Sequence, residues 1–122
     1  MAKYVDGFVL VVPKAKRAAY KKMAKEGAEI WRKFGAIDYK ECRADDMTPP
    51  NITFTFPKMA KAKEGDEVWF SFIVFKSKTE RNSINKKVMA YMEKKYADSK
   101  DFSMPFDMKR MSYGGFTVEV ED

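Results

Sequence analysis

Two segments of this chain are apolar on both faces of an extended strand, and this constrains the fold more than any other feature. Residues 4–12 and 67–75 consist mostly of β-branched and aromatic residues, which are typical of strands. Successive side chains of a strand point to opposite faces, so each segment needs cover on both sides. A sheet built from them therefore needs a packed layer on each face.

Periodicity and capping signals predict the next elements. Apolar residues at three- and four-residue spacing predict an amphipathic helix over 14–34. Ser77 and Glu80 have the spacing of a capping box, which predicts that a second helix begins there. An alternating pattern predicts a strand over 36–43, and residues 109–120 are expected to form the last strand.

Three stretches depart from regular patterns. Residues 45–66 form a long connection with a short alternating run at 53–56, and connections of this length are often functional. Residues 97–107 are expected to form a loop. Gly114 and Gly115 interrupt the last strand, which predicts a β-bulge or a close approach of another group.

The order of elements is β-α-β, a long connection, and β-α-β. This order predicts an α+β fold of the ferredoxin-like βαββαβ kind, an antiparallel sheet with two helices on one face. The length fits one domain, residues 1–122. Because the helices cover only one face, the other apolar face needs a partner. A second subunit is the simplest cover, so we expect a homodimer.

The net charge of +6 comes from one segment, because residues 14–34 hold eight cations against two carboxylates. On a helix, Lys14, Lys21, Lys25 and Arg32 fall opposite the apolar stripe. We interpret this basic stripe as a solvated face. Phosphate binding, and so association with nucleic acid, is the alternative interpretation.

Composition excludes several chemistries. The chain has no histidine, which removes histidine-dependent triads and the usual zinc and iron sites. We expect no cofactor and no metal, since no phosphate-loop, dinucleotide or paired-cysteine motif is present. The N-terminal residues lack a signal pattern, and no apolar run approaches the ~20 residues of a membrane span. A cytoplasmic location without membrane contact is therefore expected.

Asp6, Arg110 and Tyr113 are the candidate ligand-binding residues. Asp6 is a carboxylate within an apolar strand, so it must be paired, hydrated or shifted in pKa. It acts as an acid/base in a pocket, as a structural partner of Lys109 or Arg110, or as a contact in the dimer interface. The first and last strands are neighbours in the predicted topology, and they bring these residues within reach. Arg110 is suited to clamping an anionic group and Tyr113 to orienting a ligand. The alternative interpretation is that these residues anchor their loop across the dimer interface.

Glu41 and Cys42 lie next to each other and point to opposite faces of their strand. Glu41 is interpreted as either a surface pair or a pocket acid. Cys42 lacks a histidine to activate it, so a buried small apolar residue is the expected role.

Several segments resemble the YbaA-like family, an uncharacterised bacterial family. The resemblance rests on Val5–Phe8, Trp31–Ala36, Tyr39–Cys42, Val68–Phe72 and Met104–Phe116. It implies the dimeric α+β barrel superfamily, in which two ferredoxin-like sheets face each other between subunits. Relatives in that superfamily include cofactor-independent monooxygenases, with pockets between sheet and helices or inside the barrel.

The sequence therefore favours a cytoplasmic homodimer that binds a small, largely apolar molecule in a pocket of the barrel. Whether it is an enzyme is left open. One alternative is a cofactor-independent, monooxygenase-like enzyme that uses Asp6, Arg110 or Tyr113. The second alternative is a nucleic-acid-associated protein that uses the basic first helix.

Overall fold

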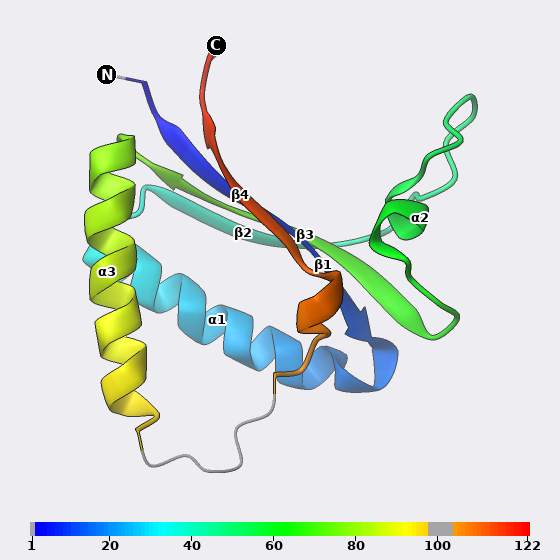
Figure 1. Ribbon diagram of the computed structural model, residues 1–122, viewed down its shortest axis with the longest axis horizontal. Coiled ribbons are helices and arrows are strands. Elements are labelled where there is room, and N and C mark those ends of the chain that lie inside the picture. Colours follow the sequence, from blue (N-terminus) through cyan, green and yellow to red (C-terminus); the bar gives the residue numbers. More distant parts are fainter. Residues whose placement is uncertain (1, 98–103) are drawn as a thin grey trace.

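The two strands that are apolar on both faces lie side by side in the centre of one antiparallel sheet (Figure 1). The computed structural model describes residues 2–97 and 104–122, and their strands form a sheet of order β2-β3-β1-β4. The strands are β1 (Tyr4–Pro13), β2 (Asp38–Arg43), β3 (Asp66–Phe75) and β4 (Ser112–Thr117). This order confirms the predicted ferredoxin-like α+β fold.

Two long helices lie against one face of this sheet (Figure 1). A short 3-10 helix η1 (Lys14–Lys16) leads into α1 (Arg17–Phe34), and α3 (Lys78–Lys95) follows β3. Gly35, with φ of 120°, ends α1 in a conformation that favours glycine. The Ser77 hydroxyl accepts a hydrogen bond of 3.1 Å from the Glu80 amide, which confirms the predicted N-cap of α3.

The apolar core fills the space between these helices and the sheet. One cluster joins α1, α3 and β3 through Ile30, Ile73, Phe75, Ile84 and Val88. A second cluster, nearer the start of α1, contains Leu10, Val12, Tyr20, Ala24 and Trp69. Among the helices of the described residues, none is both long and apolar enough to cross a membrane.

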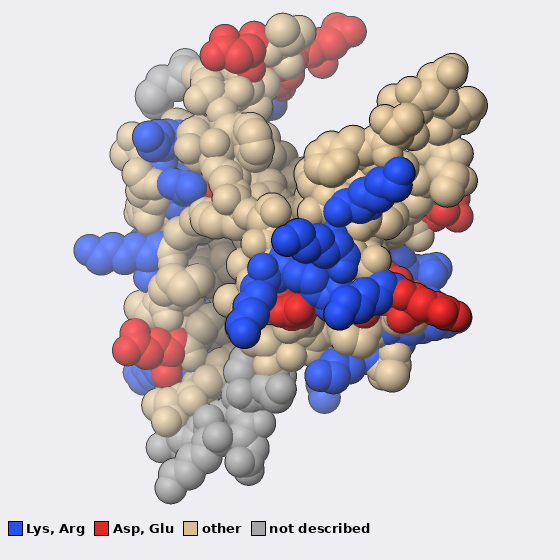
Figure 2. All heavy atoms as spheres, turned by 45° about the vertical axis from the view of Figure 1, so that its right-hand side comes forward, with Lys and Arg blue, Asp and Glu red and all other residues tan. Residues whose placement is uncertain are grey.

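Among the residues that the structure describes, only those at one end cover the opposite face of the sheet, which we call the open face. There α2 (Phe56–Ala60) packs its Ala60 against Val11 and Val68. Along the rest of this face, Phe70 and Phe116 are 45% and 62% exposed. In Figure 2 the segment that projects at the upper right is mostly tan, and the surface is hollowed between it and the strands, with Lys and Arg below.

Two elements differ from the sequence-based expectation. The alternating run at 53–56 is not a strand, because Thr55 caps a short helix with Pro57 in its first turn. The last strand begins at Ser112 rather than at 109, because a 3-10 helix η2 (Met108–Arg110) precedes it. Of the expected loop over 97–107, residues 98–103 lie outside the described part of the chain.

Gly114 and Gly115 cause no bulge, since β4 pairs with β1 in continuous register. Gly115 instead lies close to the Tyr4 ring, and a Cβ built there would be 2.6 Å from Cε2 of Tyr4.

The expectation for Cys42 was wrong. Its side chain is exposed, because β2 is an edge strand and this position faces away from the helices.

Candidate functional site

A cavity of about 390 Å³ lies between the helices and the sheet. We call it the inner cavity. Its wall is formed mainly by apolar and aromatic side chains from both helices, three strands and the segment before β4. They include Phe8, Leu10, Trp31, Ile73 and Phe106, together with six of the nine methionines of the chain, Met23, Met89, Met92, Met104, Met108 and Met111.

The main polar feature in this wall is the carboxyl group of Glu41. Its Oε1 accepts a hydrogen bond of 2.6 Å from the Tyr20 hydroxyl, and its Oε2 accepts one of 2.6 Å from the Tyr39 hydroxyl. The Ser71 hydroxyl is a third donor to the same group. Glu41 is therefore held in a fixed orientation by side chains from α1, β2 and β3.

Burial dominates the electrostatics of this cluster. Desolvation raises the pKa of Glu41, although the hydroxyl donors of Tyr20, Tyr39 and Ser71 oppose the shift. Burial, together with the adjacent carboxylate, also raises the pKa of both tyrosines, so they act as hydrogen-bond donors. Of the two sequence interpretations of Glu41, its position in the cavity wall agrees with that of a pocket acid.

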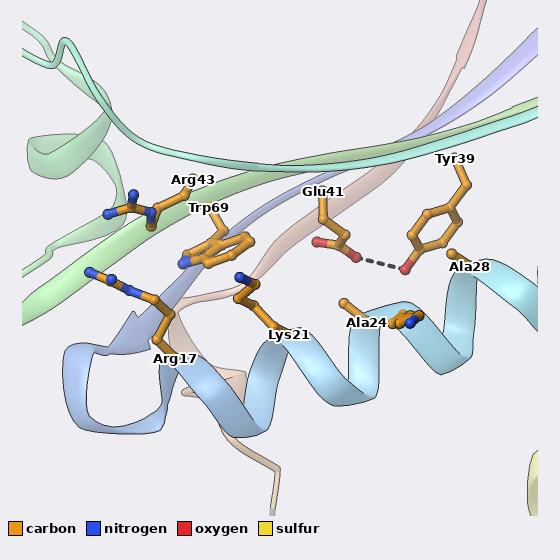
Figure 3. Close-up of a pocket in the computed structure, with 9 residues that line it drawn as sticks. Arg17, Lys21, Ala24, Ala28, Tyr39, Glu41, Arg43 and Trp69 are labelled. Atoms are coloured by element: carbon orange, nitrogen blue, oxygen red, sulfur yellow. Dashed lines mark hydrogen bonds between the residues drawn. The ribbon is translucent and has the colours of Figure 1, made fainter.

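A second hollow, of about 400 Å³, lies between α1 and β2 (Figure 3). We call it the basic groove, since Arg17, Lys21, Lys25 and Arg43 all line it. In Figure 3, Lys21 rises from α1 towards the strands, and Glu41 points down from the sheet.

The cations of the basic groove are unequally paired. Arg17 donates to Glu67 through Nε at 2.9 Å, and Nη1 of Arg43 lies 3.7 Å from the same carboxylate. Lys21 and Lys25 are exposed and make no ion pair within the described residues. Lys21 and Lys25 belong to the basic stripe that was interpreted as a solvated face. That part of the stripe therefore borders the basic groove.

Asp6 lies at the centre of a separate hydrogen-bond network. Its Oδ1 accepts a bond of 2.9 Å from Nε of Arg81, and its Oδ2 accepts one of 3.0 Å from Nδ2 of Asn85. Nη2 of Arg81 continues to the Tyr113 hydroxyl at 3.0 Å. On the other side, Nε1 of Trp31 donates to Oδ1 of Asn85 at 2.9 Å. The network thus links Asp6 and Tyr113 with the cavity-lining Trp31.

The expected pairing of Asp6 with Lys109 or Arg110 was wrong. Arg110 precedes β4, whereas Asp6 pairs with Gly115 near the far end of that strand. The Arg110 guanidinium instead bonds Asp66 at 2.8 Å and Asp107 at 2.8 Å. These contacts fasten η2 to the start of β3 and give Arg110 an anchoring role.

The sequence of α3 contains a pattern that indicates the buried ion pair of Arg81, although periodicity alone did not identify it. Arg81 and Asn85 lie on the same helix face as the buried Ile84 and Val88, at spacings of three and four residues. A polar pair within an apolar stripe indicates a buried polar partner, and Asp6 is that partner.

Within the described residues, no group of three or more acidic or cysteine side chains is placed to hold a metal ion.

The sheet order and helix placement define a ferredoxin-like protein. The crystal structure of a dimeric ferredoxin-like protein from an uncultured marine organism matches it with a TM-score of 0.60, 9% identity and full coverage of both chains. The chain belongs to the family described as protein of unknown function (DUF1428), whose pattern matches residues 3–108.

Two relatives match almost the whole chain. The uncharacterized protein YbaA of Escherichia coli K12 is 42% identical over 120 residues, which cover 98% of this chain and 99% of that protein. The YbaA protein of Shigella flexneri gives the same identity and coverage. The resemblance inferred from the sequence is thereby confirmed.

Proposed function

We propose that this protein is a homodimer that binds a small, largely apolar molecule in the inner cavity. The observation that carries the proposal is the cavity itself. Its volume of about 390 Å³ falls within the roughly 300–1,000 Å³ of small-molecule sites. An apolar wall with one oriented polar cluster is also the usual composition of such sites.

The cavity lies between the sheet and the helices, whereas the open face is on the other side of the sheet. The proposed ligand site is therefore within one subunit rather than in a barrel between two sheets. Dimer formation through the open face would leave the inner cavity unchanged.

The open face supports the proposed dimer. It carries Phe70, Phe72, Val74 and Phe116, and an apolar surface of this kind is unusual on a monomer. The dimeric protein from the marine organism shares the fold, and its assembly is a precedent for the one proposed here.

Direct ligand contact by Asp6, Arg110 or Tyr113 stays a prediction. Asp6 and Tyr113 reach the wall of the inner cavity through Asn85 and Trp31, so they are suited to positioning that wall. Arg110 is engaged by two carboxylates and the carbonyl of Lys61.

Isothermal titration calorimetry with 1-decanol as the ligand tests the binding proposal. Wild-type protein should bind with one saturable site per chain. Met89→Trp should weaken binding, because Met89 is 57% exposed but lines the cavity, so a larger side chain obstructs the cavity while the core is left intact. The matched control is Val120→Trp, at a position that is 89% exposed. Absence of saturable binding to apolar probes would overturn the proposal.

A further inference from the structure

The inner cavity and the basic groove are adjacent hollows. Ala24, Tyr39 and Glu41 line both of them, which places a largely apolar space next to a cationic surface at these three residues. We propose, building on the proposed function, that the ligand is a single-chain organic acid. Its apolar chain occupies the inner cavity and its carboxylate lies in the basic groove.

The charges of the groove determine the sign of the ligand head group. Four cations line it, while the carboxylates next to them are Glu41 and Glu67. Glu67 already pairs with Arg17 and Arg43, whereas Lys21 and Lys25 make no ion pair with the described residues, so their ammonium groups suit an incoming anion. A cationic head group in the groove would be repelled by these two ammonium groups.

Glu41 lies where the two hollows meet, and its chemistry is compatible with a neighbouring anion. Its oxygens are already engaged by the hydroxyls of Tyr20, Tyr39 and Ser71. Burial raises the pKa of Glu41, so its neutral form, which donates a hydrogen bond to a carboxylate, is easier to populate.

The composition of the inner cavity determines the other end of the ligand. Methionine side chains are unbranched and polarizable, and they adapt to irregular apolar shapes. A flexible alkyl chain suits a wall rich in such residues. The proposed ligand thus combines an alkyl chain for one hollow with an acid group for the next.

The first test compares decanoate, 1-decanol and decylammonium, three ligands with the same chain and different head groups. Wild-type protein should bind decanoate tightest and decylammonium weakest. In Lys21→Ala/Lys25→Ala, decanoate affinity should fall on the order of tenfold, as expected for two exposed charge contacts, while decanol affinity should not change. The matched control is Lys86→Ala/Lys87→Ala, which removes the same charge from exposed positions on α3.

The second test measures the orientation of the acid. The chain has two tryptophans, of which Trp31 lines the inner cavity and Trp69 lines the basic groove. Bromine quenches tryptophan fluorescence at short range. With Trp69→Phe, 10-bromodecanoate should quench Trp31 more than 2-bromodecanoate does. With Trp31→Phe, the order should reverse for Trp69.

The outcomes separate this inference from the proposed function. If decanol and decylammonium bind as tightly as decanoate, or if the quenching order is reversed, the acid assignment is wrong and the apolar site stands. If none of the three ligands binds saturably, the proposed function itself fails. Circular dichroism of each variant confirms that its fold is intact.

Discussion

The Asp6 carboxylate, 1% exposed near the start of β1, accepts a hydrogen bond of 2.9 Å from Nε of Arg81, a residue 75 positions later in the chain. This ion pair joins the central strand to the first turn of α3. Asn85 completes the coordination of the carboxylate, and the Arg81 guanidinium lies 5.1 Å from the Tyr4 ring. A charge that is unusual in an apolar strand is thus fully compensated.

Replacing Asp6 with Ala should lower the free energy of unfolding by about 3 kcal/mol, because Arg81 and Asn85 lose their acceptor in a buried setting. Urea denaturation measures the change. The double variant Asp6→Leu/Arg81→Met should recover much of the loss, since apolar replacement of a buried pair is often neutral. Asp38→Ala, which removes an exposed pair with Lys40, should have little effect. Equal losses for Asp6→Ala and Asp38→Ala would contradict this account.

Glu41 should make stability depend on pH. Its pKa in the folded state is raised above the ordinary value of 4.5, so the folded protein binds this proton more tightly than the unfolded chain. The stabilisation is therefore fully present at low pH and is lost as the pH rises from about 4.5 through the raised pKa. Glu41→Gln should flatten this part of the profile, as thermal unfolding at pH values from 4.5 to 8 would show. An unchanged profile would exclude Glu41 as its source.

The adjacent residues Gly114 and Gly115 of β4 should differ sharply in how much an added methyl group destabilises the protein. Gly115→Ala should destabilise the protein by about 1–2 kcal/mol, because the new Cβ lies 2.6 Å from Cε2 of Tyr4 and displaces that ring. Gly114→Ala is the control, since the nearest atom to its Cβ is 4.0 Å away, on Phe116. Chemical denaturation of the two variants provides the comparison, and similar losses would show that Tyr4 moves freely.

A charge on the open face should dissociate the proposed dimer. Phe70 is 45% exposed in the isolated chain, so Phe70→Lys should leave the fold intact and give a monomer in sedimentation velocity. Val120→Lys is the control, because Val120 is 89% exposed and lies outside the sheet. A monomeric wild-type protein at micromolar concentration would refute the dimer directly.

The regular elements were predictable because their signals are local. The double-faced apolar pattern of residues 4–12 and 67–75 identified the two central strands, and the spacing of Tyr20, Ile30 and Trp31 identified the first helix. The short helix α2 was missed, since a single turn capped by Thr55 gives too few residues for a period.

The candidate site was less predictable, because it depends on side-chain directions between distant elements. The sequence showed that Asp6 needs a partner, but strand adjacency pointed to Arg110, whereas the actual partner comes from a helix. Glu41 was left between two interpretations, because the enclosing Tyr20 and Ser71 come from other elements. The order of the elements predicts which strands are neighbours. The hydrogen-bond partner of a buried polar side chain depends on side-chain directions, which the sequence does not give.

The methionines around the inner cavity give this protein a built-in set of spectroscopic reporters. Selective ¹³C labelling of methionine methyl groups would yield nine labelled sites in the chain, of which six lie on the cavity wall. Met47 and Met59, which border the hollow beside α2, serve as internal references within the same spectrum. Ligand entry, its stoichiometry and its exchange rate can then be observed by NMR in the wild-type chain, without any substitution.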